Sequence, residues 1–164
     1  MTIRPTNIPA QAVQPNEGDL IVTLSGDDTW TPALAADETA DDSDKTIAVT
    51  AAQVWQILWV WVELTTTADV GDRQIVIQIQ DDATDVVAEF RAGAVQAASL
   101  TRKYMFAPAL ADLTGFRDTD YLMTPFPPTM VLLPSYIIRV YDNNAVAVAA
   151  DDMVIQMGYA WKAV

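Results

Sequence analysis

The chain of 164 residues contains no cysteine and no histidine. Without cysteine, neither disulfides nor thiolate chemistry is available. Without histidine, the chain lacks the commonest general base, the usual partner of a nucleophilic serine and the commonest transition-metal ligand. Zinc sites and histidine-dependent triads are excluded on this basis, and no pair of carboxylates stands out as a glycosidase site. We therefore expect no enzyme and no cofactor.

Basic residues are scarce. Nine lysines and arginines stand against 22 acidic residues, which gives a net charge of −13. Phosphate binding relies on clustered cations, so nucleic-acid binding is not expected. The longest apolar run is far shorter than the ~20 residues of a membrane-spanning helix, and the N-terminus lacks the apolar core of a signal peptide. The acidity indicates solubility and repulsion between free subunits, or complementarity to a basic partner surface.

The segment Val54–Leu64 is rich in tryptophan and holds only two polar side chains. Strict alternation along a strand places Trp55, Ile57, Trp59 and Trp61 on one face. The other face then carries Val54, Leu58, Val60, Val62 and Leu64. Both faces are apolar, although a small β domain normally turns one of them to water. The second face therefore needs a partner, which favours an assembly component.

Three roles are open for the tryptophans: core packing, a protein interface, where tryptophan is enriched at hot spots, and a platform for stacking sugars. Trp161, near the C-terminus, is a further candidate. We predict that at least one of Trp55, Trp59 and Trp61 lies within reach of a neighbouring subunit.

The first 18 residues are predicted to form an extended arm that contacts a neighbour or a shell. Pro5, Pro9 and Pro15 each remove a backbone donor and oppose helix formation. Residues 19–164 are expected to form one domain, which is long enough to bury ~68–70% of its unfolded surface. A short strand is predicted at Leu20–Leu24, followed by a polar, acidic connection over residues 25–45.

The rest of the chain predicts short strands separated by turn signals, with no helical period. Residues 107–128 contain several prolines and are interpreted as a long connection. We expect an all-β antiparallel β-sandwich with jelly-roll topology. The predicted strands cover residues 46–50, 54–64, 74–80, 86–91, 100–106, 130–133, 136–142 and 153–161.

Several polar groups invite a functional reading. The acidic residues of segment 37–44 lack the spacing of a calcium-binding loop, so a solvated loop is expected there rather than a metal. The pairs Asp81/Asp82 and Asp151/Asp152 are interpreted as turn residues. The glutamines at 74, 78 and 80 alternate with isoleucine and predict an exposed polar face, or a wet contact with a symmetric partner.

The chain resembles small β-rich virion proteins of tailed bacteriophages over roughly residues 54–160. The residues that carry the resemblance are TTTADVGDRQIVI (65–77), QAASLTRKYMFAP (96–108), LPSYIIRVYD (133–142) and AADDMVI (149–155).

The resemblance implies a capsid decoration, or cement, protein: a homotrimer on the virion surface that binds the major capsid protein of a phage head. It implies a fold and a setting and names no active site. An apolar surface for self-association and an extended arm suit that role. The alternative is a receptor- or carbohydrate-binding module of a tail or head fibre.

Overall fold

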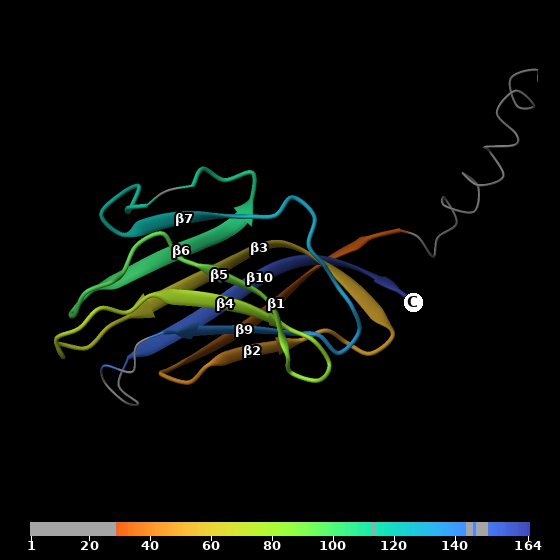
Figure 1. The fold of residues 1–164 in the computed structure, drawn as a ribbon, viewed down its shortest axis with the longest axis horizontal. Coiled ribbons are helices and arrows are strands. Elements are labelled where there is room, and N and C mark those ends of the chain that lie inside the picture. Colours follow the sequence, from red (N-terminus) through yellow and green to blue (C-terminus); the bar gives the residue numbers. More distant parts are fainter. Residues whose placement is uncertain (1–28, 113, 144–145, 147–150) are drawn as a thin grey trace, which may run out of the picture.

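A computed structural model describes residues 29–112, 114–143, 146 and 151–164. In this part of the chain all regular structure is β, arranged as two sheets that pack face to face (Figure 1). The strands are β1 (Thr31–Asp41), β2 (Lys45–Ala48), β3 (Gln53–Thr65), β4 (Ile75–Gln80), β5 (Val86–Arg91), β6 (Thr101–Pro108), β7 (Tyr121–Phe126), β8 (Val131–Leu132), β9 (Ile137–Asp142) and β10 (Asp152–Ala163). The predicted β-sandwich is confirmed.

The strand order is that of a jelly roll with an addition on one edge. Sheet A has the order β1-β10-β3-β6-β7, with β8 also paired to β3, and sheet B has the order β2-β9-β4-β5. All pairs are antiparallel except β6 with β7. Without β7 and β8, eight strands remain in two facing sheets of four, and the chain passes repeatedly from one sheet to the other.

The core lies between the sheets and follows the alternation of the strands. On β4, Ile75, Ile77 and Ile79 point inward, and on β3 the inward residues include Val60 and Val62; each of these five is at most 2% exposed. Burying a side chain of this size contributes about 1.5–3 kcal/mol. The alternation of residue types that predicted these strands therefore corresponds to the side chains that pack in the core.

Strand β3 does not keep one alternation along its length. Gly158 of β10 pairs with Trp59, but the next residue, Tyr159, pairs with Ile57, so Leu58 is an extra residue in a β-bulge. Before the bulge Trp55 and Ile57 face the core, and after it Val60 does, whereas Leu58 is 39% exposed and Trp59 and Trp61 are partly exposed. The expectation that Trp55, Trp59 and Trp61 share a face is therefore wrong.

Two strands lie where connections were expected. Strand β1 occupies much of the predicted acidic connection 25–45, and its inward positions carry small residues such as Ala33 and Ala35, which give little apolar signal. Strand β7 lies within the segment 107–128 and contains Pro125, which sequence patterns count against a strand. The arm at residues 1–18, with Pro5, Pro9 and Pro15, and the predicted strand Leu20–Leu24 lie outside the described residues.

Candidate interaction surface and buried polar network

The outer face of sheet A carries apolar side chains in register across all five strands of its main path. One transverse row consists of Ala36, Gln156, Trp61, Met105 and Met123, from β1 to β7. Such a row spans ~20 Å, because neighbouring strands lie ~4.8 Å apart. Gln156 is its only polar member.

A second row runs beside the first. It contains Leu34, Gly158 and Trp59, and Ala107 pairs with Pro125 farther along the sheet. Leu34 is 74% exposed, an unusual environment for a leucine on a regular strand. Scattered apolar residues are normal on a protein surface, but contiguous patches of several hundred Å² mark interaction sites. The two rows together place these apolar side chains next to one another on one face of the sheet.

A shallow groove of about 650 Å³ lies within this face. Its apolar lining consists of Leu58, Trp59, Trp61, Met105, Ala107 and Leu110, and Gln156 is its one polar lining residue. The bulge supplies Leu58 and Trp59, and the connection after β6 supplies Leu110. Among the residues that the structure describes, no titratable group lines the groove, so its attraction for a ligand rests on apolar contact and one amide.

Gly158 determines how Trp59 lies at this surface. A Cβ atom built on Gly158 would stand 2.3 Å from Trp59 Nε1 and 2.4 Å from Cε2. The Trp59 indole therefore lies directly against the backbone of β10 at Gly158, and any larger residue at 158 would displace it. A flat, held ring offers apolar area with little conformational entropy to lose on binding.

Polar contacts border the patch. Along the next row toward the far end of the strands, Lys103 Nζ lies 3.7 Å from Glu63 Oε2 and 5.7 Å from the centre of the Tyr121 ring. At the β1 side, the Gln156 amide donates to Glu38 Oε1 at 2.7 Å. An apolar centre with a polar border is the usual anatomy of a protein interface.

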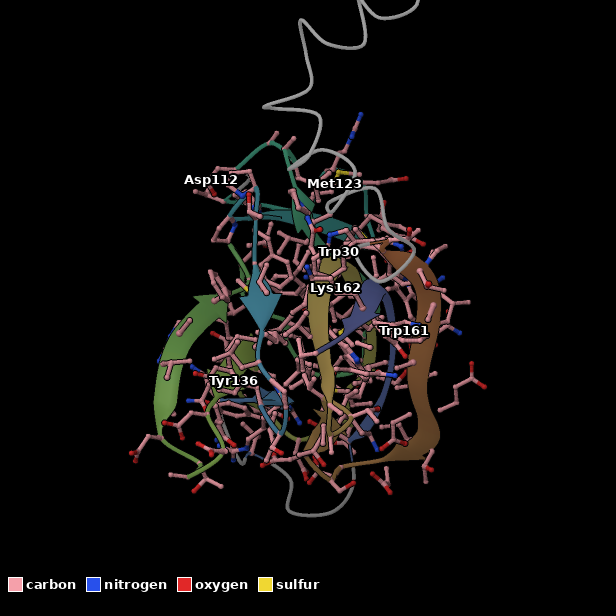
Figure 2. All side chains as sticks on the ribbon, turned by 90° about the vertical axis from the view of Figure 1, so that its right-hand side faces the viewer. Trp30, Asp112, Met123, Tyr136, Trp161 and Lys162 are labelled. Atoms are coloured by element: carbon pink, nitrogen blue, oxygen red, sulfur yellow. The ribbon has the colours of Figure 1, made fainter. Side chains whose placement is uncertain are left out.

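The other two candidate tryptophans lie on the inner side of sheet A. Trp55 is buried and stacks on Tyr159 with the ring centres 3.9 Å apart. Trp161 pairs with Trp55 across the strands and packs against the core where it opens at one end. At that end, Lys162 Nζ lies 5.6 Å from the centre of the Trp30 ring (Figure 2). Trp55 is therefore a core residue, Trp161 is partly buried against the core, and Trp59 and Trp61 are partly exposed on the outer face.

The outer face of sheet B has the opposite character. Gln78 is only 8% exposed; its amide nitrogen donates to Glu89 Oε2 and Tyr141 Oη, both at 2.9 Å, and its amide oxygen accepts from Arg139 at 3.1 Å. The Arg139 guanidinium also pairs with Asp44. The hydrogen bond from Gln78, with another from Arg91, lowers the pKa of Glu89. The prediction of an exposed glutamine face is wrong for Gln78, which is satisfied within the chain.

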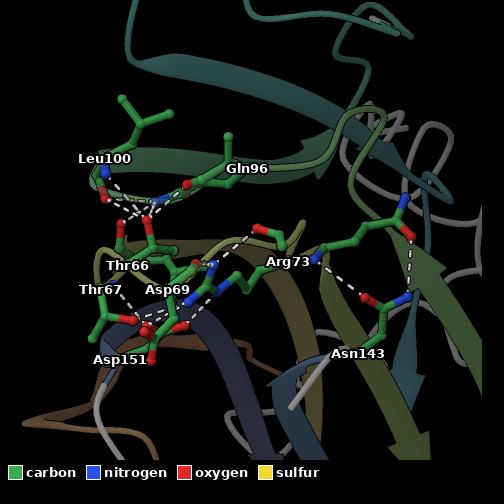
Figure 3. Close-up of polar contacts among 12 residues, drawn as sticks. Thr66, Thr67, Asp69, Arg73, Gln96, Leu100, Asn143 and Asp151 are labelled. Atoms are coloured by element: carbon green, nitrogen blue, oxygen red, sulfur yellow. Dashed lines mark hydrogen bonds and ion pairs between the residues drawn. The ribbon is translucent and has the colours of Figure 1, made fainter. Parts of the chain in front are cut away.

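A fully buried ion pair holds one end of the sandwich (Figure 3). Arg73, with a side chain that is 0% exposed, donates to both carboxylate oxygens of Asp151, at 2.6 and 3.1 Å, and to the carbonyls of Asp69 and Gly71. Asp151 also accepts from the Thr67 amide at 2.7 Å. Burial acts to raise the pKa of Asp151, but the hydrogen bonds from Arg73 and Thr67 outweigh it, and the pKa lies below its usual value. Asp151 lies at the bend before β10, as expected, but its carboxylate bonds to distant residues rather than to its own neighbouring backbone.

Gln96 extends this network, again without exposure. Its amide nitrogen donates to the carbonyls of Leu64 and Leu100, at 2.9 and 2.8 Å, and its oxygen accepts from Tyr104 Oη at 2.8 Å. The backbones of Arg73 and Gln96 also bond to each other. Burial raises the pKa of the Tyr104 hydroxyl, which therefore stays protonated as the donor. The Arg73–Gln96 network ties together three connections distant in sequence.

Three acidic residues have structural roles that the hydrogen bonds define. Asp81 accepts from the amides of Ala83 and Asp85 at 2.9 Å, which confirms its role in a turn. Asp41 accepts from the buried Lys45 ammonium at 2.5 Å, and this bond, with others from Ser43, lowers its pKa to about 2. Carboxylate oxygens of Asp42, Asp142 and Asp151 lie within 4.8 Å of one another, but Asp151 is already held by Arg73.

No family model and no curated protein matches the chain. Among solved structures, it is similar to a chain from the structure of the infectious bursal disease virus Gx strain. The TM-score is 0.33 and the sequence identity 10%, and the match covers 80% of this chain and 38% of the viral chain. The chain thus spans less than half of that viral chain. Within the described residues, no helix has the length and apolarity needed to cross a bilayer.

Sequence reasoning found part of this surface. It singled out Trp59 and Trp61, but not Met105, Ala107 and Leu110, which come to the groove from β6 and the connection after it. Their signal is weak, because Met105 and Ala107 alternate with the buried Tyr104 and Phe106 in a strand that is apolar throughout. Only the register between β3 and β6 reveals that they adjoin the tryptophans.

Proposed function

We propose that this protein is a structural component of a phage virion, a trimeric head decoration protein that binds the capsid surface and stabilises it. It acts by binding alone, with no catalytic step. The observation that carries the proposal is the apolar outer face of sheet A, in a chain that otherwise carries a net charge of −13. Such a face is unfavourable in water and becomes favourable once another protein surface covers it.

The resemblance of segments 65–77, 96–108 and 133–142 to phage virion proteins supports the setting. Two of these segments supply the Arg73–Gln96 network, which rigidifies one end of the sandwich and presents no open reactive group. A rigid sandwich whose buried polar groups are hydrogen-bonded within the chain, and which has one apolar face, suits a protein that bridges capsid subunits. When a trimer bridges several capsid subunits, several contacts must break together, and the shell gains stability through effective concentration.

Two measurements test this proposal. Mass determination of the purified protein at micromolar concentration should give three copies, and a monomer there would contradict the trimer. Electron microscopy of intact particles should place the protein on the outside of the head, over the junctions between capsid subunits. Density at a fibre or tail tip would instead reject the decoration role.

A carbohydrate-binding module is the second candidate, and the groove itself favours it. Trp59 and Trp61 offer ring faces beside Gln156, an amide that can bond to hydroxyl groups. A glycan array separates the two functions: specific sugar binding that is lost in Trp61→Ala and retained in Trp161→Ala would establish the module. If the array shows no sugar binding and the protein still binds the capsid, the result supports the decoration role.

A further inference from the structure

Strand β1 is held to the rest of the sandwich by few side-chain contacts. None of its eleven side chains is buried, and Ala35 is its one apolar residue that packs against the core. Its largest apolar residue, Leu34, is 74% exposed and pairs with Gly158, which has no side chain to meet it. Because small or exposed side chains remove little apolar surface from water, they do little to keep the strand in place.

Strand β5 shows how a comparable edge strand is anchored. Among the strands that the structure describes, β5 and β1 are the two without a buried side chain. Phe90 of β5, however, packs edge-on against Phe126 of β7, with the ring centres 4.9 Å apart. An aromatic ring brings a large apolar area to such a contact. β1 contains no aromatic residue and has no anchor of this size.

Backbone pairing with β10 is therefore the main attachment of β1, which lies at the edge of sheet A (Figure 1). The two strands pair from Thr31 to Asp37, the register is then interrupted, and pairing returns at Asp41. When a strand separates, its backbone bonds are exchanged for bonds to water, so each contributes only a modest net amount. Just before β1, Lys162 Nζ lies 5.6 Å from the Trp30 ring, a further weak contact.

The far end of β1 is fixed in a different way. Lys45, the first residue of β2, is 0% exposed, and its ammonium donates to the carbonyl of Thr39 at 2.7 Å and to Asp41 at 2.5 Å. Losing these acceptors would leave a buried cation poorly compensated, which is strongly unfavourable. The corner between β1 and β2 therefore stays closed under conditions in which the pairing of Thr31–Glu38 is lost.

We propose that β1 is a releasable strap: Thr31–Glu38 separates from β10 and rejoins it while the rest of the sandwich stays folded. Separation stops at the corner that Lys45 holds. The released segment swings about Thr39 on a tether of at most ~29 Å, its length in full extension. Release also breaks the bond between Gln156 and Glu38, so the one amide that lines the groove becomes free.

Opening changes both ends of the connection between the sandwich and the chain before it. Residues 1–28 precede β1 in the sequence, so a load applied to them acts first on Thr31 and separates the pairs one after another. Their point of attachment then moves from Thr31 to Thr39 without unfolding of the core. Opening is a property of a single chain and needs no oligomer, so it stands or falls separately from the decoration role.

Hydrogen exchange of the full-length protein, measured by mass spectrometry, tests the strap. The β1 amides that bond to β10 should exchange at least about tenfold faster than the bonded amides of β2, β4 and β5, because a local opening needs less free energy than global unfolding. If the bonded amides of β1 exchange as slowly as those of β4, the strand leaves only when the whole protein unfolds, which contradicts the strap. If β2 exchanges together with β1, the corner at Lys45 does not stop the opening, and the proposal is wrong.

A disulfide lock provides a matched control. The natural chain has no cysteine, and Ala36 and Gln156 stand opposite each other on β1 and β10. A variant with Ala36→Cys and Gln156→Cys is compared in its oxidised and reduced forms. Oxidation should slow exchange in segment 31–38 by at least about tenfold and leave β5 unchanged. Equal rates in the two forms would overturn the proposal, because exchange would then not require the strands to separate.

A second pair of variants needs no cross-link. Ala35→Val adds apolar area on the inner side of β1, whereas Ala36→Val adds the same group on the outer side. Exchange in segment 31–38 should become slower in Ala35→Val than in Ala36→Val, because only the inner methyl groups reach the core. Equal exchange in both variants would contradict the view that the small inner side chains make β1 releasable.

Discussion

The Arg73–Gln96 network and the groove on sheet A invert the usual relation between polarity and exposure. Arg73 and Gln96 are 0% exposed, whereas Leu34 is 74% exposed and Trp59 and Trp61 are partly so. The difference lies in where the partners are. Arg73 and Gln96 find their partners within the chain, including Asp151 and Tyr104. The groove side chains have apolar neighbours only on one side, so their burial depends on something that binds.

Sheet B reinforces this contrast. Its outer face is polar, yet Gln78 bonds to Glu89, Tyr141 and Arg139 and leaves little for a partner to satisfy. A face whose polar groups are hydrogen-bonded within the chain contributes to folding. A face whose apolar side chains stay partly exposed contributes to association. Stability and assembly should therefore respond to different substitutions.

The largest effect on stability should come from Arg73→Met. Removing the guanidinium leaves Asp151 buried without its charged partner, a loss of about 3–5 kcal/mol in the free energy of unfolding. Urea denaturation measures it, and an isosteric double variant, Arg73→Met with Asp151→Leu, should recover part of the loss. If Arg73→Met unfolds at the same urea concentration as the natural protein, the Arg73–Asp151 pair does not stabilise its end of the sandwich.

The next largest effect concerns association. Trp61→Asp puts a carboxylate at the centre of the apolar row and should weaken assembly by at least ~2 kcal/mol per contact, the scale of an interface hot spot. Analytical ultracentrifugation should then show smaller species, with the urea midpoint nearly unchanged. Val87→Asp, on the outer face of sheet B, is the control and should leave assembly intact. Equal dissociation in both variants would erase the contrast between the two faces.

Acid should separate the two regions as well. The folded-state pKa of Asp151 is lowered, so its contribution is complete above its unfolded pKa of ~3.9 and disappears as pH falls through the folded value. Unfolding free energy should thus be steady from neutral pH to ~5 and decline below ~4. Asp151→Asn should flatten that decline. Groove contacts, which involve no titratable lining residue, should not change with pH where the fold persists.

The smallest effect is expected from Gly158→Ala. The added Cβ would stand 2.3 Å from Trp59 Nε1, so the indole must tilt away from β10. Overpacking of this kind costs about 1 kcal/mol where a side chain can move. We expect weaker association with a nearly normal fold, measured by sedimentation and by a shift in tryptophan emission. A variant that assembles normally would mean that the flat Trp59 ring is not part of the contact.

The sequence predicted the strands in which alternation and packing agree. Isoleucines at alternate positions placed β4 correctly, and the segment 86–91 matched β5. It missed β1 because Ala33 and Ala35 fill an edge position with small side chains. It missed β7 because Pro125 counts against a strand in the middle of a sheet, whereas this strand lies at the edge of sheet A. Edge position is a tertiary property that local patterns do not carry.

The bulge in β3 was missed, although the sequence holds a signal for it. Gln56 and Glu63, the two polar residues of Val54–Leu64, stand seven positions apart. An odd separation cannot place both on the outward face of a regular strand. Both are in fact partly exposed, because Leu58 shifts the alternation between them. The Arg73–Gln96 network had no such signal, since its members are brought together only by the packing of the two sheets.

In β3 the extra residue at the bulge, rather than the types of residue, decides which side chains face the core and which face the surface. Without the bulge, a strand with all of these residues would keep one uninterrupted alternation, and it could not bury Trp55 and Ile57 while turning Trp59 and Trp61 outward. One half of the strand would have to change sides. The one extra residue, Leu58, thus separates the aromatic residue that packs in the core, Trp55, from the two that lie on the outer face, Trp59 and Trp61.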